Sequence, residues 1–194
     1  MISDKITNKD GNTIEGPLLL KPKIFRDSRG YFFESWNKQN FNEIVGRNVE
    51  FVQDNHSFSL RGALRGLHYQ KKPFDQGKLV RCISGEIFDI LVDLRKSSIT
   101  FSQWFGVKLS SENNYQLWIP EGFAHGFLSI SENAEILYKT TSFWNAESEI
   151  TLLWDDPIIN IDWPFEEYQI SNPFLSDKDM RGNYLSDLKE NEIF

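Results

Sequence analysis

The chain has 194 residues, a formal net charge of −7 at pH 7 and an aromatic content of 14%. This length is typical of one domain, since single all-β units often reach about 200 residues. The acidic balance argues against nucleic acid as a partner. The single cysteine, Cys82, excludes an internal disulfide framework, and we expect it to be a small core residue.

The first ten residues are charged, and no stretch of the chain is apolar for long enough to cross a bilayer. We therefore expect neither a signal peptide nor a membrane partner. A reducing cytoplasm is the predicted compartment.

Short apolar runs predict β-strands along almost the whole chain. They cover residues 18–20, 31–36, 50–53, 78–83, 86–94, 101–109, 115–119, 123–130, 134–141 and 150–154. Helix is expected only over residues 37–45, with an asparagine cap, and as a turn at residues 176–180. The pattern predicts an all-β sandwich, jelly roll or barrel with a few short helices. We expect one domain over residues 1–183 and a polar, loosely held tail over residues 184–194.

Two of the three histidines lie between glycines and aromatic residues in segments that read as buried strands. His68 lies in Leu64–Gln70, and His125 lies in Pro120–Phe127. Histidine is the side chain best suited to move protons near neutral pH, so the two segments predict a site.

The geometry of the first segment stays open at this point. In a regular strand, Arg65 faces away from His68, because alternate residues point to opposite faces. Gly62 and Gly66 permit a bulge that would bring both side chains to one pocket.

Positive charge is concentrated in residues 61–81. Six cations against one anion, Asp75, give this stretch a net charge of +5: Arg61, Arg65, Lys71, Lys72, Lys78 and Arg81. Lys71 and Lys72 read as a solvated loop, whereas the others flank glycines in apolar runs. Such a patch on an acidic chain fits a small anionic ligand, such as a phosphate or diphosphate ester.

The alternation of side chains along a strand predicts which face further polar residues occupy. Gln53 and Asn55 are expected to share one face of a strand, with Asp54 and His56 on the other. Tyr138 is expected to point inward, where its hydroxyl needs a partner or a substrate.

A metal site is the chemical alternative, because many jelly rolls bind iron, manganese or zinc through histidines and a carboxylate. Such proteins typically place two histidines one residue apart on one strand. This chain contains no such pair, which disfavours a metal, although its three histidines could still converge in space.

Several long motifs resemble the dTDP-4-dehydrorhamnose 3,5-epimerase family. They occur in order between about Leu18 and Asp179: Phe51–Ser57, Leu64–Gln70, Gln76–Arg81, Gly85–Asp89, Gln116–Phe127 and Leu137–Thr141. The resemblance implies a cupin-type jelly roll that acts as a homodimer, without cofactor or metal. It implies a dTDP-4-keto-6-deoxy sugar as substrate, in the pathway to dTDP-L-rhamnose.

The resemblance also implies catalytic roles. His68 would be the base, Tyr138 the acid on the opposite face of the sugar, and Lys78 the cation that stabilises the enolate. Asp179 would orient His68 and raise the basicity of its imidazole, with Asp177 as a close rival for this place.

Ligand contacts carry over by the same resemblance. Those to the nucleotide, the diphosphate or the sugar would come from Arg29, Glu34, Gln53, Asn55, Arg65, His125, Glu149 and Lys178. Trp144 falls where the family often has a tyrosine that stacks on thymine, and an indole stacks at least as well. Two alternatives stay open: an epimerase acting at C3 or C5 only, and a non-catalytic jelly roll that binds a nucleotide sugar.

Overall fold

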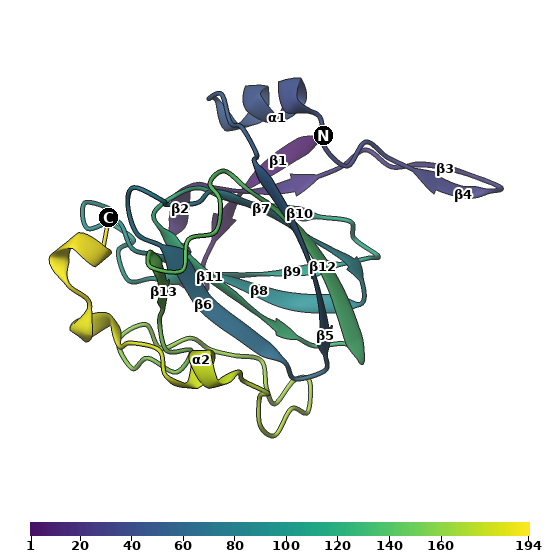
Figure 1. Cartoon of the computed structure of the whole chain (residues 1–194). Helices are drawn as coiled ribbons and strands as arrows, with labels where there is room; N and C mark the ends of the chain where they lie inside the picture. Colours follow the sequence, from purple (N-terminus) through teal and green to yellow (C-terminus); the bar gives the residue numbers. More distant parts are fainter.

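Two antiparallel sheets form the body of the computed structural model, which describes residues 1–194 (Figure 1). The first sheet has six strands in the order β1 (Ile2–Thr7), β2 (Thr13–Lys21), β10 (Gln116–Ile119), β7 (Lys78–Ser84), β12 (Asn133–Thr140) and β5 (Gln53–Leu60). The second has five, in the order β13 (Glu149–Thr151), β6 (Leu64–Gln70), β11 (Phe123–Ser129), β8 (Glu86–Asp93) and β9 (Trp104–Ser110). This arrangement confirms the expected all-β jelly roll.

Apolar side chains fill both the space between the sheets and the outer face of the five-stranded sheet. The inner cluster includes Val80, Leu91 and Phe127. The outer cluster includes Leu67 and Leu128. Strands β6 and β11 are therefore buried on both faces, which is why their sequences read as continuous buried strands.

The short helices agree with the sequence expectation. Helix α1 (Lys38–Val45) begins at Asn37, whose side chain accepts a hydrogen bond from the Asn40 backbone N–H, and ends at Gly46 in the left-handed conformation. Helix α2 (Asp177–Met180) begins at the N-cap Ser176.

Three strand expectations need correction. The run at residues 31–36 forms a strand only to Phe32, and the run at residues 50–53 is mostly irregular, with β5 beginning at Gln53. Strand β1 was not predicted because Ile2 and Ile6 are its only apolar residues, with the charged Asp4 between them on the same face, so no clear apolar alternation marks it.

The C-terminal segment also differs from the loosely held tail expected from its polarity. It contains two 3₁₀ turns, Leu185–Asp187 and Glu190–Glu192, and Leu185 is buried. The Tyr69 hydroxyl donates to the Glu192 carbonyl at 2.8 Å, and the Phe194 N–H donates to the Leu94 carbonyl at 3.1 Å. Its few apolar residues therefore cover the outer face of the five-stranded sheet.

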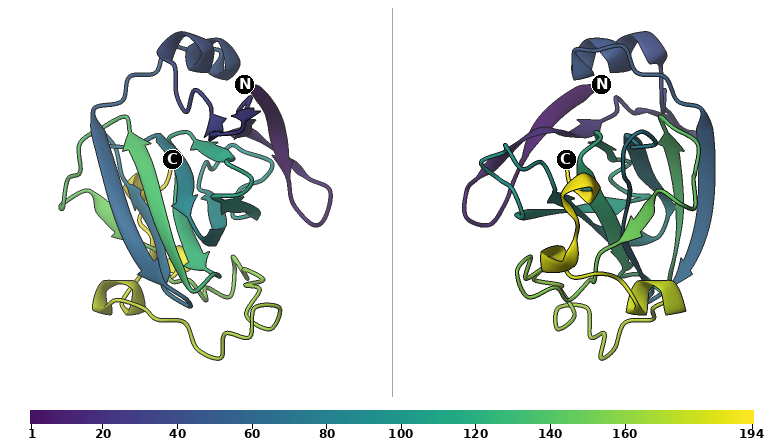
Figure 2. Two further views of the ribbon diagram at one scale, coloured as in Figure 1. Left: turned by 90° about the vertical axis from the view of Figure 1, so that its right-hand side faces the viewer. Right: turned by 60° about the vertical axis from the view of Figure 1, so that its left-hand side comes forward.

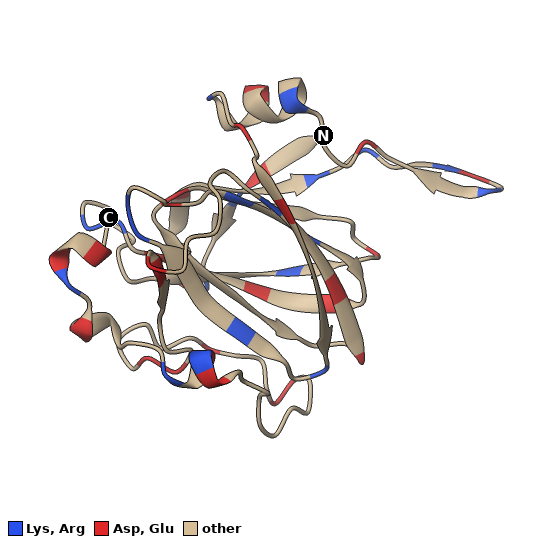
Figure 3. Ribbon diagram, viewed as in Figure 1, with Lys and Arg blue, Asp and Glu red and all other residues tan.

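A two-stranded hairpin, β3 (Phe25–Asp27) and β4 (Gly30–Phe32), projects from the body in Figure 1. The two further views of Figure 2 show α1 at one end of the sheets and α2 at the other. The side chains of Phe25, Tyr31 and Phe32 are more than half exposed. Basic residues lie along this hairpin and also on the strands of the body (Figure 3). None of the helices has the length and apolar character that a membrane span requires.

Candidate active site

A bulge in β6 brings Arg65 and His68 to the same face. His68 pairs with His125 of β11, and Arg65 pairs with Phe127. The two residues between Arg65 and His68 on β6 therefore oppose the single residue Gly126 on β11, which is a bulge. Gly66 permits this because a Cβ there would lie only 2.6 Å from the Cα of Gly126. The structure thus decides between the two geometries that the sequence left open.

The bulge faces a pocket of about 310 Å³ between the two sheets. His68, Arg65 and His125 come from the five-stranded sheet, whereas Lys78 and Tyr138 come from the six-stranded sheet. The pocket is completed by Ser57, Gly126, Phe127, Ile136, Trp144, Glu149, Ser176, Lys178 and Asp179. A ligand held here lies between groups from two opposite walls.

His68 and Asp179 form a hydrogen-bonded dyad. The His68 Nε2 lies 2.5 Å from Asp179 Oδ1, and Ser176 Oγ donates to Asp179 Oδ2 at 2.7 Å. Asp179 is 3% exposed, whereas its rival Asp177 is exposed, so the geometry selects Asp179. With Nε2 bound to the carboxylate, Nδ1 is the nitrogen of His68 left free to take up a proton.

Burial decides the protonation of this dyad. It lowers the pKa of His68, and the charges of Lys178 and Lys78 add to this, so the upward pull of Asp179 is outweighed. Asp179 thus raises the basicity of the imidazole as expected, but the net pKa of His68 still lies below its ordinary value. For Asp179, burial raises the pKa, but the hydrogen bond and charge of His68 outweigh it, and the net pKa is lowered. Near neutral pH the pair is an imidazole beside a carboxylate, the state that a base requires.

Lys78 places a cation beside the dyad. Its side chain is 9% exposed, and its Nζ donates to the His68 carbonyl at 3.2 Å. Burial lowers the pKa of Lys78 to about 8, although the charges of Glu149 and Asp89 oppose this. The group therefore stays largely protonated at pH 7.

Tyr138 faces the pocket from the opposite sheet. It lies opposite Asn55 of β5 and Val80 of β7, on the inner face, as strand parity predicted. Burial and the charge of Glu149 raise the pKa of its hydroxyl, so this group carries its proton near neutral pH. The pocket thus has an unprotonated imidazole on one wall and a protonated hydroxyl on the other.

The predicted contact residues at the rim form a connected set. The Gln53 side chain donates to Asn55 Oδ1 at 2.9 Å and accepts from the Trp144 backbone N–H at 3.0 Å. The indole of Trp144 is 58% exposed at the rim. Lys178 Nζ lies 3.0 Å from Glu149 Oε1, and this pairing outweighs burial and lowers the pKa of Glu149.

Four predicted contact residues do not line this pocket. Gln53 and Asn55 adjoin it through the hydrogen bonds to Trp144, whereas Arg29 and Glu34 lie away from it. Arg29 lies on the projecting hairpin, where it pairs with Asp27. Glu34 follows the hairpin and accepts hydrogen bonds from the side chains of Asn37 and Asn40. Neither side chain touches the pocket that their own chain forms.

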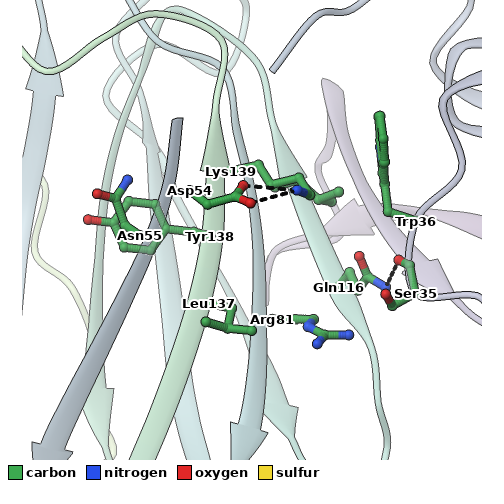
Figure 4. Close-up of a pocket in the computed structure, with 10 residues that line it drawn as sticks. Ser35, Trp36, Asp54, Asn55, Arg81, Gln116, Leu137, Tyr138 and Lys139 are labelled. Atoms are coloured by element: carbon green, nitrogen blue, oxygen red, sulfur yellow. Dashed lines mark hydrogen bonds and ion pairs between the residues drawn. The ribbon is translucent and has the colours of Figure 1, made fainter. Parts of the chain in front are cut away.

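Other polar residues lie on the outer face of the six-stranded sheet. Figure 4 shows Asp54 and Lys139 paired on one side of the sheet, with Asn55 and Tyr138 on the other. Arg81 lines a second, shallow pocket on this outer face, so it does not contribute to the pocket between the sheets that contains Lys78. His56 pairs with Glu135 at 2.9 Å, so the three histidines do not converge.

Sequence reasoning missed several residues that line the pocket and one that lies beneath it. Ser57 shares the inward face of Gln53 and Asn55, so parity continued along β5 would have found it. Asp89, which binds His125, is a lone charge inside the apolar run of β8. No sequence signal singles out Ser176, Phe127 or Ile136, because each depends on how the two sheets are stacked.

The jelly roll thus holds a pocket in which an imidazole–carboxylate dyad faces a protonated phenol, with Arg65, Lys78 and Lys178 as cations in its lining. A family model described as dTDP-4-dehydrorhamnose 3,5-epimerase matches residues 12–187. The dTDP-4-dehydrorhamnose 3,5-epimerase of Shigella flexneri is 58% identical over 170 residues, which is 88% of this chain and 91% of that protein.

Solved structures agree. The structure of a dTDP-6-deoxy-D-glucose-3,5-epimerase from Legionella pneumophila, in complex with dTDP-4-keto-L-rhamnose, superposes with a TM-score of 0.90. Its identity is 42%, covering 99% of this chain and 97% of that one. A 3'-monoepimerase from Streptomyces bikiniensis has 33% identity and a TM-score of 0.82, covering 89% and 85% of the two chains. The chain belongs to the dTDP-4-dehydrorhamnose 3,5-epimerase family.

Proposed function

We propose that this pocket converts dTDP-4-dehydro-6-deoxy-D-glucose to dTDP-4-dehydro-L-rhamnose by inverting C3 and C5. One observation carries the assignment of roles: the His68–Asp179 dyad and the Tyr138 hydroxyl face one pocket from opposite sheets, with Lys78 beside the dyad. A module that only binds a nucleotide sugar has no need of this arrangement.

The chemistry follows from the C4 ketone, which makes the C–H bonds at C3 and C5 weakly acidic. The neutral imidazole of His68 takes a proton from one carbon, and the electron pair moves onto the ketone oxygen as an enolate. The ammonium of Lys78 stabilises that oxygen. Tyr138 then returns a proton to the opposite face of the carbon. Proton exchange with solvent resets both groups before the second carbon is inverted.

Proton exchange tests this function. Incubation of the 4-keto sugar nucleotide with the protein in D2O should place deuterium at both C3 and C5. Label at one position only would indicate an epimerase of the monoepimerase kind. No label from a folded protein would support the binding module instead.

The rim residues suit the dTDP handle. Trp144 offers an exposed indole face for thymine. Arg65, which donates to Ser59 Oγ at 2.9 Å, and Lys178 supply positive charge for the diphosphate or the sugar. Gln53, Asn55 and Glu149 add acceptors and donors around the rim.

We further propose that the protein acts as a homodimer in which the hairpin serves a neighbouring pocket. Arg29 and Glu34 do not reach the pocket of their own chain, and the hairpin exposes aromatic side chains that a second copy would cover. Light scattering should give twice the monomer mass of 22.7 kDa.

A mixing experiment tests the shared site. Arg29→Ala and His68→Asn copies should each be inactive alone. When they are mixed and exchanged, one pocket of each mixed dimer combines an intact hairpin with an intact base, and activity should return. A mixture as inactive as its components would argue that each chain completes its own site.

The cytoplasm stays the predicted compartment of the protein.

A further inference from the structure

A second histidine–carboxylate pair lies beneath the pocket. The His125 Nε2 lies 2.8 Å from Asp89 Oδ1. The strand register explains the contact: His125 is opposite Leu91 of β8, so Asp89, two residues earlier on the same face, is its diagonal neighbour. Asp89 is fully buried, and His125 is 9% exposed.

The environment of Asp89 is unusual for a buried carboxylate. Its second oxygen, Oδ2, is buried without a hydrogen-bond partner. Asp93, on the same strand and equally buried, accepts from the Arg95 side chain at 2.9 and 2.8 Å and from Thr100 Oγ1 at 2.7 Å. A buried carboxylate needs such partners if it is to add stability. Its ion pair with Arg95 and its hydrogen bond from Thr100 account for the burial of Asp93, whereas Asp89 has only the ring of His125 as a partner.

The pair fixes the orientation of a ring that lines the pocket. Because Nε2 of His125 is bound to Asp89, the nitrogen left for a ligand is Nδ1. His125 lies directly opposite His68 in the β6–β11 ladder, so the two rings are neighbours on one wall. Asp89 also adds negative charge close to Lys78.

We propose that Asp89 is a positioning residue for the epimerisation: it holds the His125 ring with Nδ1 directed at the sugar, and its charge supports the ammonium of Lys78. This inference rests on the function proposed above. Asp89 itself does not line the pocket and would act through His125 and Lys78.

Several charged and titratable groups surround Lys78 and act on its pKa together with Asp89. These are Asp89 on β8, Glu149 on β13, Lys178 on α2, His68 and Arg65 on β6, His125 on β11 and Tyr138 on β12. Asp89 and Glu149 are the two carboxylates whose charge raises the pKa of Lys78. Removing the charge of Asp89 should therefore move the alkaline fall of activity to lower pH.

Two variants separate the contributions. Asp89→Asn keeps the shape and removes the charge, whereas Asp89→Leu removes the hydrogen bond as well. We expect Asp89→Leu to lower kcat about 10- to 100-fold, by analogy with the loss of the partner that orients a metal-ligating histidine, with KM changed less than about 3-fold. Both variants should lose activity at lower pH than the wild type. Affinity for dTDP alone should be unchanged, because the handle binds elsewhere.

At a pH low enough for Lys78 to stay protonated in every variant, the double variant Asp89→Leu/His125→Asn should be no slower than His125→Asn, because Asp89 then acts only through that ring. The matched control is Asp93→Asn, which should lose thermal stability but keep the pH profile of the folded fraction. If the rate losses of Asp89→Leu and His125→Asn multiply in the double variant at that pH, the proposal is overturned. A pH profile of Asp89→Asn activity identical to that of the wild type would also overturn it. If the wild type itself exchanges no protons, the failure lies with the proposed function.

If the Asp89 variants do not fold, the tautomer of His125 in the wild type tests the proposal. Long-range ¹H–¹⁵N NMR distinguishes the protonated nitrogens of the three imidazoles, assigned with His56→Asn and His125→Asn. The proposal requires His125 to carry its proton on Nε2. A ring protonated on Nδ1 alone, or one exchanging between tautomers, would refute it.

Discussion

Replacing Lys78 with methionine should make the protein more stable and nearly inactive. The side chain is 9% exposed, and burial lowers its pKa from 10.5 to about 8. One unit of pKa corresponds to about 1.4 kcal/mol, so the buried ammonium costs the folded state about 3 kcal/mol at pH 7. Methionine has a similar length and no charge, and it removes this cost. Loss of the group that stabilises the enolate should lower kcat about 10²- to 10³-fold.

The stability gain should depend on pH with a definite sign. Because the folded pKa lies below the unfolded one, the unfolded state binds more protons between pH 8 and 10.5, and wild-type stability rises with pH there. The advantage of Lys78→Met should therefore be complete below about pH 8 and shrink to about 1 kcal/mol at pH 10.

Urea unfolding at pH 7 and pH 10, at one fixed protein concentration, measures both effects. Lys5→Met is the matched control: Lys5 is exposed and pairs with Glu15 on the surface, so its change should stay within about 0.5 kcal/mol. A Lys78→Met protein that is less stable than the wild type at pH 7, or equally more stable at both pH values, would refute the account of Lys78 as a costly buried cation.

Four further outcomes are expected. His68→Asn should abolish proton exchange, with a rate loss of about 10²- to 10⁴-fold, whereas Tyr138→Phe should retain exchange at the first carbon and lose inversion; identical behaviour of the two variants would contradict the assigned roles. Trp144→Ala should weaken dTDP binding by about 1–3 kcal/mol in calorimetry, and unchanged affinity would exclude stacking there. The pH profile of kcat/KM should rise through a His68 pKa below 6.5 and fall above about 8, as Lys78 loses its proton; a profile that is flat to pH 10 would exclude Lys78. Activity should survive exhaustive chelation, and loss restored by added Zn²⁺, Fe²⁺ or Mn²⁺ would overturn the Lys78 assignment.

Much of the pocket could be predicted because strand parity and motif order carry local information. The inward direction of Tyr138 follows from its apolar neighbours on one face, and the structure agrees. The choice between a regular strand and a bulge at Arg65 could not be made, because it depends on how closely Gly126 of another strand approaches Gly66. Residue order contains no information about that distance.

Other differences have the same origin in tertiary structure. The polar segment after residue 183 was expected to be loose, yet a few apolar residues, including Leu185 and Phe194, suffice to hold it against the sheet. The basicity of His68 was judged from its carboxylate partner alone, whereas burial and two lysines decide its pKa. Arg29 and Glu34 were expected among the contacts, and a single chain holds them away from its pocket.

Burial gives His68 and Lys78 the opposite protonation states that the proposed reaction needs. It lowers the pKa of His68, which leaves the base unprotonated, and it lowers the pKa of Lys78 only to about 8, which leaves the cation charged. The unprotonated imidazole and the protonated ammonium therefore coexist at a pH above the lowered pKa of His68 and below that of Lys78. The carboxylates near Lys78 extend this range upward, since without Glu149 and Asp89 the same burial would remove its proton at lower pH. The acidic groups around a basic pocket are thus part of what keeps the pocket cationic.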